Sequence, residues 1–395
     1  MHFARRGVLG LGLTFALSLS ASCKKPGESG TGPAASGAAP TAEAKEIVIG
    51  HFASMTGNTA HFGQDTDKAV RLAADEANAA GGVLKKKVRV VTLDDRGDSA
   101  EASNAVSRLI DVEKVHALLG EVSSSLSLAG GRVAQRRKVV MVSPSSTNPK
   151  VTEVGDYIFR VCFLDPFQGK VMANFARNTL KLDSVAILKD VKNDYSIGLA
   201  DAFRAAFTAA GGKIAVEQSY SQGDTDFSAQ LTAIKGSGAQ AIFTPGYYSE
   251  VGAIARTAQR LGVKVPLLGG DGWDAPDLVK IGGDALEGSY FSNHFAPDVA
   301  TPKAQKFVAD FKAKYSQEPT GLGALGYDAA AVIVEAMKHA PDLSGDAIRT
   351  QLTKVKDFDG VSGKITIDGE RNAQKSAVVL KIVGGKFKYE TTVAP

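Results

Sequence analysis

Short apolar segments alternate along most of the chain with longer segments in which apolar residues recur every three to four positions. The short segments are typical of buried parallel strands and the longer ones of amphipathic helices. This alternation predicts βαβ units, and therefore an α/β fold with parallel sheets. The expected strands are 46–52, 88–93, 117–119, 139–142, 157–163, 185–188, 213–220, 241–244 and 265–269. The expected helices that alternate with them include 70–80, 99–112, 168–180, 197–210, 227–235 and 251–261.

The series of strands and helices occurs twice. The segments EANAAGGVLKKKVRVV and AFRAAFTAAGGKIAVEQSY each join a helix to a strand through Gly-Gly, and they lie about 130 residues apart. Two similar lobes are therefore expected. The alternation then stops: 302–315, 322–340 and 347–355 read as helices, and 361–390 as short antiparallel strands with Gly-Gly as one turn.

Two clusters of hydroxyl residues follow neighbouring strands of the predicted first lobe. Ser123 to Ser125 come after the strand at 117–119, and Ser143 to Thr147 come after the strand at 139–142. In open α/β sheets, ligands bind beyond the carboxyl ends of the strands. The clusters are thus candidates for binding a small polar ligand, although Ser and Thr also serve as turns and helix caps.

Composition and charge narrow the class of protein. A chain of 395 residues is too long for one ordinary core, so two domains are expected. Its 44% hydrophobic and 22% charged residues fit a soluble α/β protein. The net charge is +4, and removing Arg5 and Arg6 with the first 22 residues leaves +2 (4 − 2), too balanced to indicate nucleic-acid binding.

The N-terminus has the pattern of a targeting signal. Residues 1–22 place Arg5-Arg6 before the apolar stretch Val8 to Leu19, as in a signal peptide, and this stretch is short for a membrane span. Small residues before Cys23 resemble a bacterial lipobox, which predicts lipidation of Cys23; ordinary secretion is the alternative. Residues 23–45 are rich in Gly, Pro, Ala and Ser and are expected to form a flexible linker.

The sequence lacks the motifs of common enzyme classes. There is no G-x-S-x-G motif and no P-loop, and the six histidines show no metal-ligand spacing. The pattern from Gly321 to Gly326 fits G-x-G-x-x-G, but it follows a helix and Pro319 rather than a strand. We therefore expect no enzyme activity, no cofactor and no metal.

Polar and aromatic residues recur at predicted strand ends, or in the loops after them, in both halves of the chain. Each one alone is explained as well by packing, but their recurrence at the same sheet edge indicates a binding site for a small molecule. They are Phe62, Ser123 to Ser125, Ser145 to Thr147, Tyr195, Tyr247, Tyr248, Asp271 and Trp273.

From about Lys45 to Tyr389 the chain resembles the leucine–isoleucine–valine-binding protein family, the solute receptors of branched-chain amino acid ABC importers. The resemblance implies the type I periplasmic binding fold, with two Rossmann-like lobes joined by a three-strand hinge near Leu164, His294 and Ala377. Lobe 1 would comprise 46–164 and 295–376, and lobe 2 would comprise 165–294 and 377–395. The matching segments are IVIGHFASMTGNTAHFGQD, LDDRGDSAEA, GEVSSS, VSPSSTNP, YIFRVCFLDPFQG, NDYSIG, PGYYSE, LLGGDGWD and GYDAA.

The resemblance also implies roles for individual residues. The family's carboxylate-binding Ser matches Ser124, and two further positions match Ser145 and Thr147, which would bind the ligand carboxylate and ammonium through hydroxyl and backbone groups. We include Ser146 between the last two. A buried zwitterion needs such donors at one end and an anion at the other. The acid that pairs with the ammonium matches Asp271. The aromatic positions match Phe62, Tyr195 and Tyr247.

Three departures from the family pattern leave the ligand's side chain open. The positions that carry a disulfide in some members match Gly97 and Ser123, so this chain cannot form that disulfide. Asp271 stands where Glu is often found. Trp273 stands where a smaller residue is common; it would either stack on the ligand and narrow the pocket, or pack within its lobe.

These observations predict a periplasmic, membrane-anchored lipoprotein. As a monomeric solute-binding protein, it would bind an aliphatic, branched-chain L-amino acid and deliver it to an ABC permease in the inner membrane. One alternative is another small solute, such as an aromatic amino acid, a short amide or urea. A second alternative is a ligand-sensing module for a signalling receptor.

Overall fold

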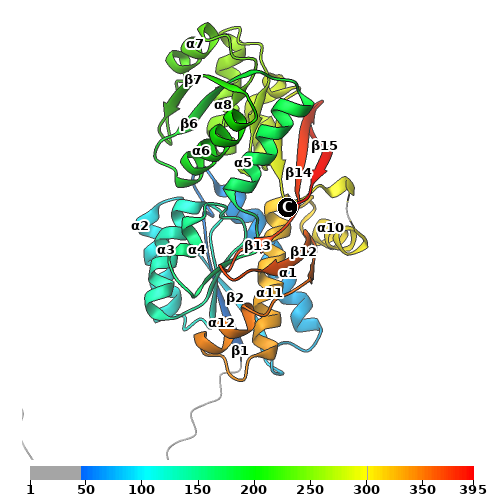
Figure 1. Ribbon diagram of the computed structural model, residues 1–395. Coiled ribbons are helices and arrows are strands. Elements are labelled where there is room, and N and C mark those ends of the chain that lie inside the picture. The colour runs from blue at the N-terminus through cyan, green and yellow to red at the C-terminus, as the bar shows by residue number, and fades with distance from the viewer. Residues whose placement is uncertain (1–45, 300) are drawn as a thin grey trace, which may run out of the picture. The chain divides into compact units, whose positions relative to one another are not determined.

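The computed structural model describes residues 46–299 and 301–395 and confirms the α/β fold with parallel sheets (Figure 1). The predicted signal peptide, Cys23 and the linker lie outside the described residues. A first sheet has the order β2-β1-β3-β4-β5, and all of its strands run parallel. We call the part of the chain built on it lobe 1. Its strands are β1 (Glu46–Ala53), β2 (Lys87–Asp94), β3 (Ala117–Leu119), β4 (Met141–Ser143) and β5 (Ile158–Arg160).

Helices cover both faces of the first sheet. On one face, Ile47 and Ile49 of β1 pack in one cluster with α1 (Ala60–Ala79) and α11 (Gly321–His339). On the other face, Val48 and Phe52 pack with α2 (Ser99–Asp111) and α3 (Ser124–Arg137). Apolar residues of the strand and of the helices thus pack together on both faces of the sheet.

Helix α1 begins at Ala60, ten residues before the start predicted from the sequence. Its first two turns were missed because they bury the polar residues Asp65, Thr66 and Asp67, which hide the apolar periodicity. The Asp65 carboxylate accepts hydrogen bonds from the backbone N–H and the hydroxyl of Thr320, just before α11. The start of α1 therefore depends on a contact with a segment that is distant in sequence.

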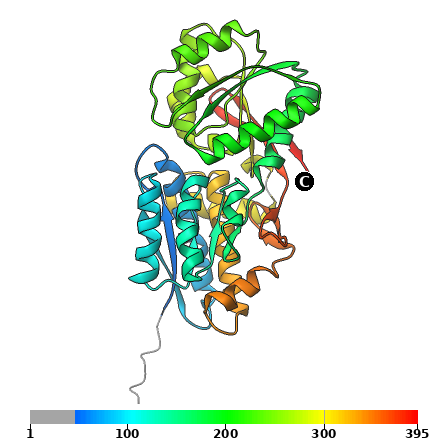
Figure 2. The ribbon, with the colours of Figure 1, turned by 60° about the vertical axis from the view of Figure 1, so that its left-hand side comes forward.

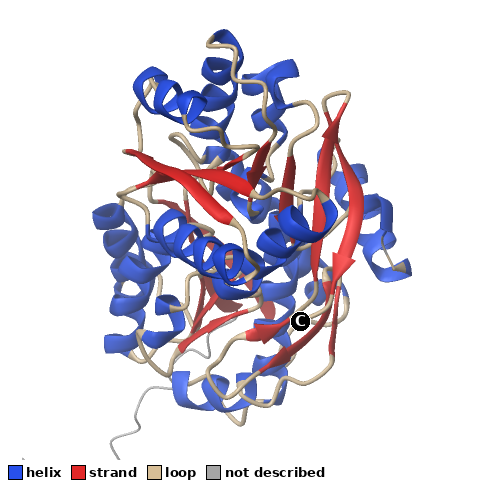
Figure 3. Ribbon diagram, turned by 45° about the horizontal axis from the view of Figure 1, so that its top comes forward, coloured by secondary structure: helices blue, strands red, loops and turns tan. Residues whose placement is uncertain are grey.

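A second sheet has the order β15-β14-β10-β9-β8-β6-β7, and we call the part of the chain built on it lobe 2 (Figure 3). Its first five strands in chain order, read as β7-β6-β8-β9-β10, are parallel and repeat the order of the first sheet. The predicted repeat is therefore confirmed in the topology, and the two Gly-Gly junctions precede β2 and β7. The strands are β6 (Ser184–Asp190), β7 (Lys213–Tyr220), β8 (Ile242–Phe243), β9 (Leu267–Gly269), β10 (Tyr290–Asn293), β14 (Ala377–Val383) and β15 (Lys386–Val393).

The antiparallel C-terminal strands are also confirmed: β14 pairs antiparallel with both β10 and β15. Strand β10 was not predicted, because its four residues form a short segment with two polar positions. The helices of lobe 2 are α5 (Asp165–Asn174, continued as a π-helix over Phe175–Thr179), α6 (Asp194–Ala209), α7 (Ser228–Gly236), α8 (Tyr248–Arg260) and α9 (Pro276–Gly282). The remaining elements are α4 (Lys150–Glu153), α10 (Pro302–Tyr315), α12 (Gly345–Leu352), the 3₁₀ turns Asp271–Trp273, Gly283–Leu286 and Pro297–Val299, and a small antiparallel sheet of β11 (Phe358–Gly360), β12 (Gly363–Ile367) and β13 (Ala373–Gln374).

The chain passes between the two lobes three times: after β5, after β10 and before β14 (Figure 2). The first two connections touch, because the rings of Phe163 and His294 stack with 3.7 Å between their centroids. The second and third connections line one cavity, to which His294 and Lys375 contribute. The three connections therefore form one hinge region.

Candidate functional site

Hydrogen bonds tie the two hydroxyl clusters of lobe 1 together at the carboxyl ends of β3 and β4. The Ser146 hydroxyl lies 2.9 Å from the carbonyl oxygen of Glu121 and 2.8 Å from the hydroxyl of Ser127. The Ser143 hydroxyl donates to the same carbonyl of Glu121 at 3.0 Å. The side chain of Ser146 thus holds the two loops against each other.

The other predicted hydroxyl residues of lobe 1 are buried but less fully bonded. The Ser124 hydroxyl accepts a hydrogen bond from the backbone N–H of Asn148 at 3.3 Å. The Thr147 hydroxyl lies 3.5 Å from the amide nitrogen Nε2 of Gln168 on α5. The hydroxyl of Ser145 is buried and has no hydrogen-bond partner. These hydroxyls therefore make few hydrogen bonds within the protein.

Aromatic residues of both lobes meet at the same place. The rings of Tyr195 and Tyr247 in lobe 2 are stacked with centroids 5.4 Å apart. Phe62 on α1 contacts Tyr247 edge-to-face at 5.4 Å and Tyr248 at 5.0 Å. The Tyr195 hydroxyl accepts from the backbone N–H of Gly272 at 3.1 Å, whereas the buried Tyr247 hydroxyl has no partner. Burial raises the pKa of both tyrosines, so their hydroxyls stay protonated.

Asp271 lies directly after β9 and is held by two side chains that the sequence did not identify. Its Oδ1 accepts from Nε2 of Gln168 at 3.1 Å, and its Oδ2 lies 2.9 Å from Nε2 of His294. Burial lowers the pKa of His294 despite the opposing effect of Asp271, so a neutral imidazole donates through Nε2. Gln168 belongs to the matching segment YIFRVCFLDPFQG, which was the available signal for it.

Asp165, the first residue of α5, is a second acid beside Asp271 and was also missed. Its Oδ1 accepts from Nε2 of Gln168 at 3.0 Å, so this amide nitrogen bridges Asp165 and Asp271. Burial raises the pKa of Asp165 to about 7, and its Oδ2 has no hydrogen-bond partner.

Trp273 packs inside lobe 2. Its indole N–H donates to the carbonyl oxygen of Thr244 at 3.0 Å, and its ring lies 5.9 Å from the ring of Phe291. A Cβ atom added to Gly269 would lie 2.1 Å from the indole. Of the two interpretations of Trp273, this placement favours packing over contact with a ligand.

The lobes touch each other around these residues. The Ser125 hydroxyl of lobe 1 donates to Asp194 Oδ2 of lobe 2 at 2.8 Å, and Nδ2 of Asn148 donates to the Asp194 carbonyl at 2.7 Å. At another edge, the backbone N–H of His61 donates to the Tyr248 hydroxyl at 3.2 Å. Contacts between the lobes thus lie next to the predicted site residues Ser124 and Phe62.

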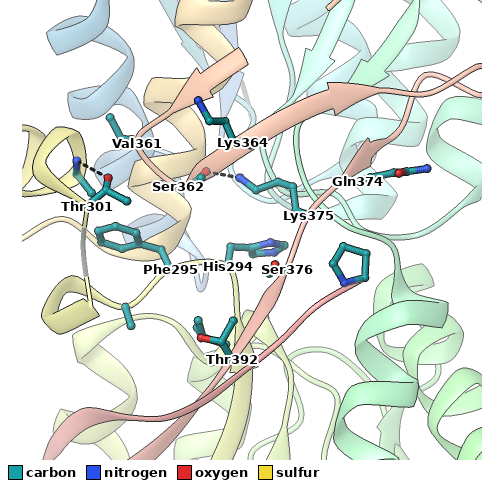
Figure 4. A pocket seen from close by; sticks show the side chains of 15 residues that line it. His294, Phe295, Thr301, Val361, Ser362, Lys364, Gln374, Lys375, Ser376 and Thr392 are labelled. Atoms are coloured by element: carbon teal, nitrogen blue, oxygen red, sulfur yellow. Dashed lines mark hydrogen bonds between the residues drawn. The ribbon is translucent and has the colours of Figure 1, made fainter. Parts of the chain in front are cut away.

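A cavity of about 400 Å³ lies at the hinge (Figure 4). His294 and Lys375 are among its lining residues, and the Lys375 ammonium donates to the hydroxyl of Ser362. Burial lowers the pKa of Lys375, although Asp328 opposes this effect. His294 thus contacts this cavity as well as Asp271.

The described ranges 46–299 and 301–395 lack two other kinds of feature. They contain no group of three or more His, Cys, Asp or Glu residues that could hold a metal ion. In the same ranges, no helix combines the length and the apolar character needed to span a bilayer.

Comparison with known proteins identifies the family. The pattern of the periplasmic binding protein family matches residues 46–386. The Leu/Ile/Val-binding protein BraC3 of Rhizobium johnstonii is 32% identical over 330 residues, which cover 83% of this chain and 89% of the relative.

Two solved structures share the fold over nearly their whole length. The leucine-binding protein LivK from Thermotoga maritima is 42% identical with a TM-score of 0.85, covering 88% of this chain and 99% of that one. The branched-chain amino acid transporter substrate-binding protein LivJ from Streptococcus pneumoniae, solved in complex with isoleucine, is 34% identical with a TM-score of 0.85, covering 89% of this chain and all of that one. The chain described here belongs to the periplasmic binding protein family.

Proposed function

We propose that this protein is the solute-binding component of an ABC importer and binds an aliphatic, branched-chain L-amino acid between its two lobes. No bond of the ligand would be made or broken; the ligand stabilises the closed form, which the permease recognises. The names of the relatives support this class of ligand, since Leu/Ile/Val-binding proteins and an isoleucine complex are among them.

The observation that carries the proposal is the distribution of polar atoms at the predicted site. Hydroxyl groups of Ser124, Ser145 and Thr147 lie on lobe 1, and the Asp271 carboxylate and the Tyr247 hydroxyl lie on lobe 2. An amino acid in its zwitterionic form needs donors for its carboxylate and an acceptor for its ammonium. We assign the hydroxyls to the carboxylate end and Asp271 to the ammonium.

The apolar part of the ligand would lie against the aromatic residues. Phe62, Tyr195 and Tyr247 are buried and in contact, and they offer apolar ring surfaces for an aliphatic side chain. We keep Ser146 and Trp273 in the proposed site as residues that position its other side chains, since each one forms its hydrogen bond within its own lobe.

We also propose how the protein is arranged in the cell. Segments 46–164 and 295–376 would move as one lobe against 165–294 and 377–395 about the three connections. Membership of the family implies an extracytoplasmic location. Lipidation at Cys23 would hold a monomer near its permease in the inner membrane.

A thermal-shift screen against the twenty amino acids, acetamide and urea tests the function. A ligand that binds only the folded state raises the melting temperature as its concentration exceeds its Kd. We expect leucine, isoleucine or valine to give the largest shift. A larger shift with an aromatic amino acid, acetamide or urea would assign a different solute, and no shift with any compound would contradict amino acid binding.

Calorimetry with Asp271→Ala then tests the ammonium assignment. Loss of the charged acceptor is expected to cost at least about 2 kcal/mol of binding free energy, because it leaves a buried ammonium without its partner. Unchanged affinity would remove Asp271 from the site.

A further inference from the structure

Asp165 has the features of a ligand-contacting group, although the matching segment YIFRVCFLDPFQG, which contains it, gave it no role. Its side chain is almost completely buried, with 1% of the residue exposed, and its Oδ2 atom has no hydrogen-bond partner. A buried carboxylate oxygen normally accepts at least one hydrogen bond, because leaving it unpaired costs free energy. This oxygen can be satisfied by a donor that is not part of the protein.

The position of Asp165 places it beside the proposed ammonium site. Nε2 of Gln168 lies 3.0 Å from Asp165 Oδ1 and 3.1 Å from Asp271 Oδ1, so both carboxylates meet at one nitrogen. The same Nε2 lies 3.5 Å from the Thr147 hydroxyl of lobe 1. The unpaired Oδ2 faces α6 of lobe 2, since a Cβ atom added to Gly198 would lie 3.3 Å from it. The backbone N–H of Asp165 also donates to the carbonyl oxygen of Thr147 in lobe 1 at 3.0 Å, so Asp165 lies at a contact between the lobes.

The cation near the Asp165 carboxylate, the Arg160 guanidinium, is already bonded to other groups. Hydrogen bonds from Thr147 and Gln168 and the guanidinium of Arg160 favour the negative form of Asp165, which Asp271 repels. That guanidinium is already bound to the carbonyl oxygens of Ser146 and Pro149. Two further titratable groups near Asp165, the Cys162 thiol and the Tyr195 hydroxyl, are neutral at pH 7 because burial raises their pKa values.

We propose that Asp165 is a second ligand-contacting carboxylate, which binds the ammonium of the ligand together with Asp271. This inference rests on the proposed function, and it narrows the substrate class. Two carboxylates in a buried site require a full positive charge on the ligand, so amino acids are bound and carboxylic acids or amides without an amine are not.

The inference also predicts a proton change on binding. Burial and Asp271 raise the pKa of Asp165 to about 7, so about half of the carboxyl groups carry a proton at pH 7. An ammonium in contact with Oδ2 favours the charged form. Binding of L-leucine at pH 7 is therefore accompanied by the release of roughly half a proton from Asp165.

The test is calorimetric titration of L-leucine at pH 7 in phosphate and in Tris buffer, whose different ionisation enthalpies reveal the number of protons released. We expect wild-type protein to release protons. Asp165→Asn, which is isosteric, should release none and bind L-leucine at least about tenfold more weakly. The preference for L-leucine over 4-methylpentanoate, which lacks the ammonium, should also shrink in this variant.

Asp328→Asn is the matched control. Asp328 is equally buried, but it lies on α11 and accepts from the backbone N–H groups of Val361 and Ser362. This variant should keep both the affinity and the proton release of the wild type, and thermal melts monitor the folding of both variants.

Three outcomes would overturn the proposal in distinguishable ways. Wild-type affinity and proton release in Asp165→Asn would remove Asp165 from the site but leave the proposed function intact. A wild-type protein that binds L-leucine with no proton release would contradict the inference even if the variant did not fold. Failure of wild-type protein to bind any branched-chain amino acid would reject the proposed function, and the inference with it.

Discussion

Unpaired hydroxyl groups are the clearest mark of the site at the scale of single residues. The hydroxyls of Ser145 and Tyr247 are both buried, lie on opposite lobes and have no hydrogen-bond partner. Each costs folding free energy in the absence of a ligand, since its hydrogen bonds with water are lost and none replaces them. Such groups weaken the free protein and become favourable when a ligand supplies their partner.

The variant Tyr247→Phe separates the effect of this hydroxyl on the stability of the free protein from its effect on ligand affinity. Removing a hydroxyl without a partner should leave the melting temperature of the free protein unchanged or raise it, whereas the affinity for L-leucine should fall by about 1 kcal/mol, roughly fivefold. Melting curves and calorimetric titrations check both quantities.

Tyr248→Phe is the adjacent control. The Tyr248 hydroxyl accepts from the backbone N–H of His61 in lobe 1, so its removal should weaken the contact between the lobes in the free protein as well. A loss of stability in Tyr247→Phe as large as that in Tyr248→Phe would show that the Tyr247 hydroxyl has a partner within the protein.

At the scale of elements, buried carboxyl groups join the turns that contain Gly97 and Ser123. The Ser54 hydroxyl, after β1, lies 3.0 Å from Asp95 Oδ1 and 2.7 Å from Glu121 Oε1. Asp95 in turn accepts from the backbone N–H of Gly97, and Glu121 from that of Ser123. These are the two positions that match the missing cysteines, so a hydrogen-bonded cluster links the same turns.

This cluster makes stability depend on pH. Burial and the neighbouring Glu121 raise the pKa of Asp95 from its ordinary 3.8 to about 8. Between these values the folded protein keeps a proton that the unfolded chain has lost, so the free energy of unfolding falls as pH rises through this range. Urea unfolding at pH 5 and pH 8 should show a loss of about 1 kcal/mol or more at the higher pH.

Asp95→Asn imitates the protonated acid and should remove most of this dependence. The variant is expected to match the wild type at pH 5 and to exceed its stability at pH 8. Parallel profiles for the two proteins would show that Asp95 is not the group that titrates.

At the scale of the whole molecule, direct contacts between the lobes surround the site. Ser125 both donates to Asp194 Oδ2 at 2.8 Å and accepts from the backbone N–H of Asp194 at 3.0 Å. Because these bonds exist only when the lobes touch, they would favour the closed form in the proposed function. A bound ligand and these bonds therefore stabilise the same arrangement.

Ser125→Ala should speed the release of L-leucine. Loss of two hydrogen bonds across the lobes is expected to raise the dissociation rate and the Kd by about fivefold, with little change in the association rate. Stopped-flow measurements give both rates. Ser103→Ala on α2 is the control, because its hydroxyl bonds only to the Ser99 carbonyl within lobe 1; equal effects of the two variants would contradict a role for Ser125 in closure.

The pattern of the chain predicted some elements well and others poorly, for local reasons. Long apolar periodicities predicted the helices that pack on the sheets, and the two Gly-Gly junctions predicted the repeat. Both junctions need glycine, since Gly81 and Gly211 have positive φ angles of 100° and 79°. Strand β10 and the first turns of α1 were missed, since distant segments complete their burial. Asp165 and Gln168 lie in the matching segment YIFRVCFLDPFQG, and His294 lies at a predicted hinge connection, but nothing local in the sequence showed that these side chains meet Asp271.

The sequence by itself determined the α/β class, the two similar lobes and the edge of each sheet where polar residues gather. These follow from periodicity and from strand direction, which are local properties of the chain. Only the tertiary structure decided which of those residues meet. It buried Trp273 in the core of lobe 2 and used the Ser146 hydroxyl to hold two loops together. It also placed Gln168 and His294 in hydrogen-bond contact with Asp271. The physical reason is that burial and hydrogen-bond pairing of a side chain depend on segments far away in sequence, which the lobes bring together only when the chain has folded.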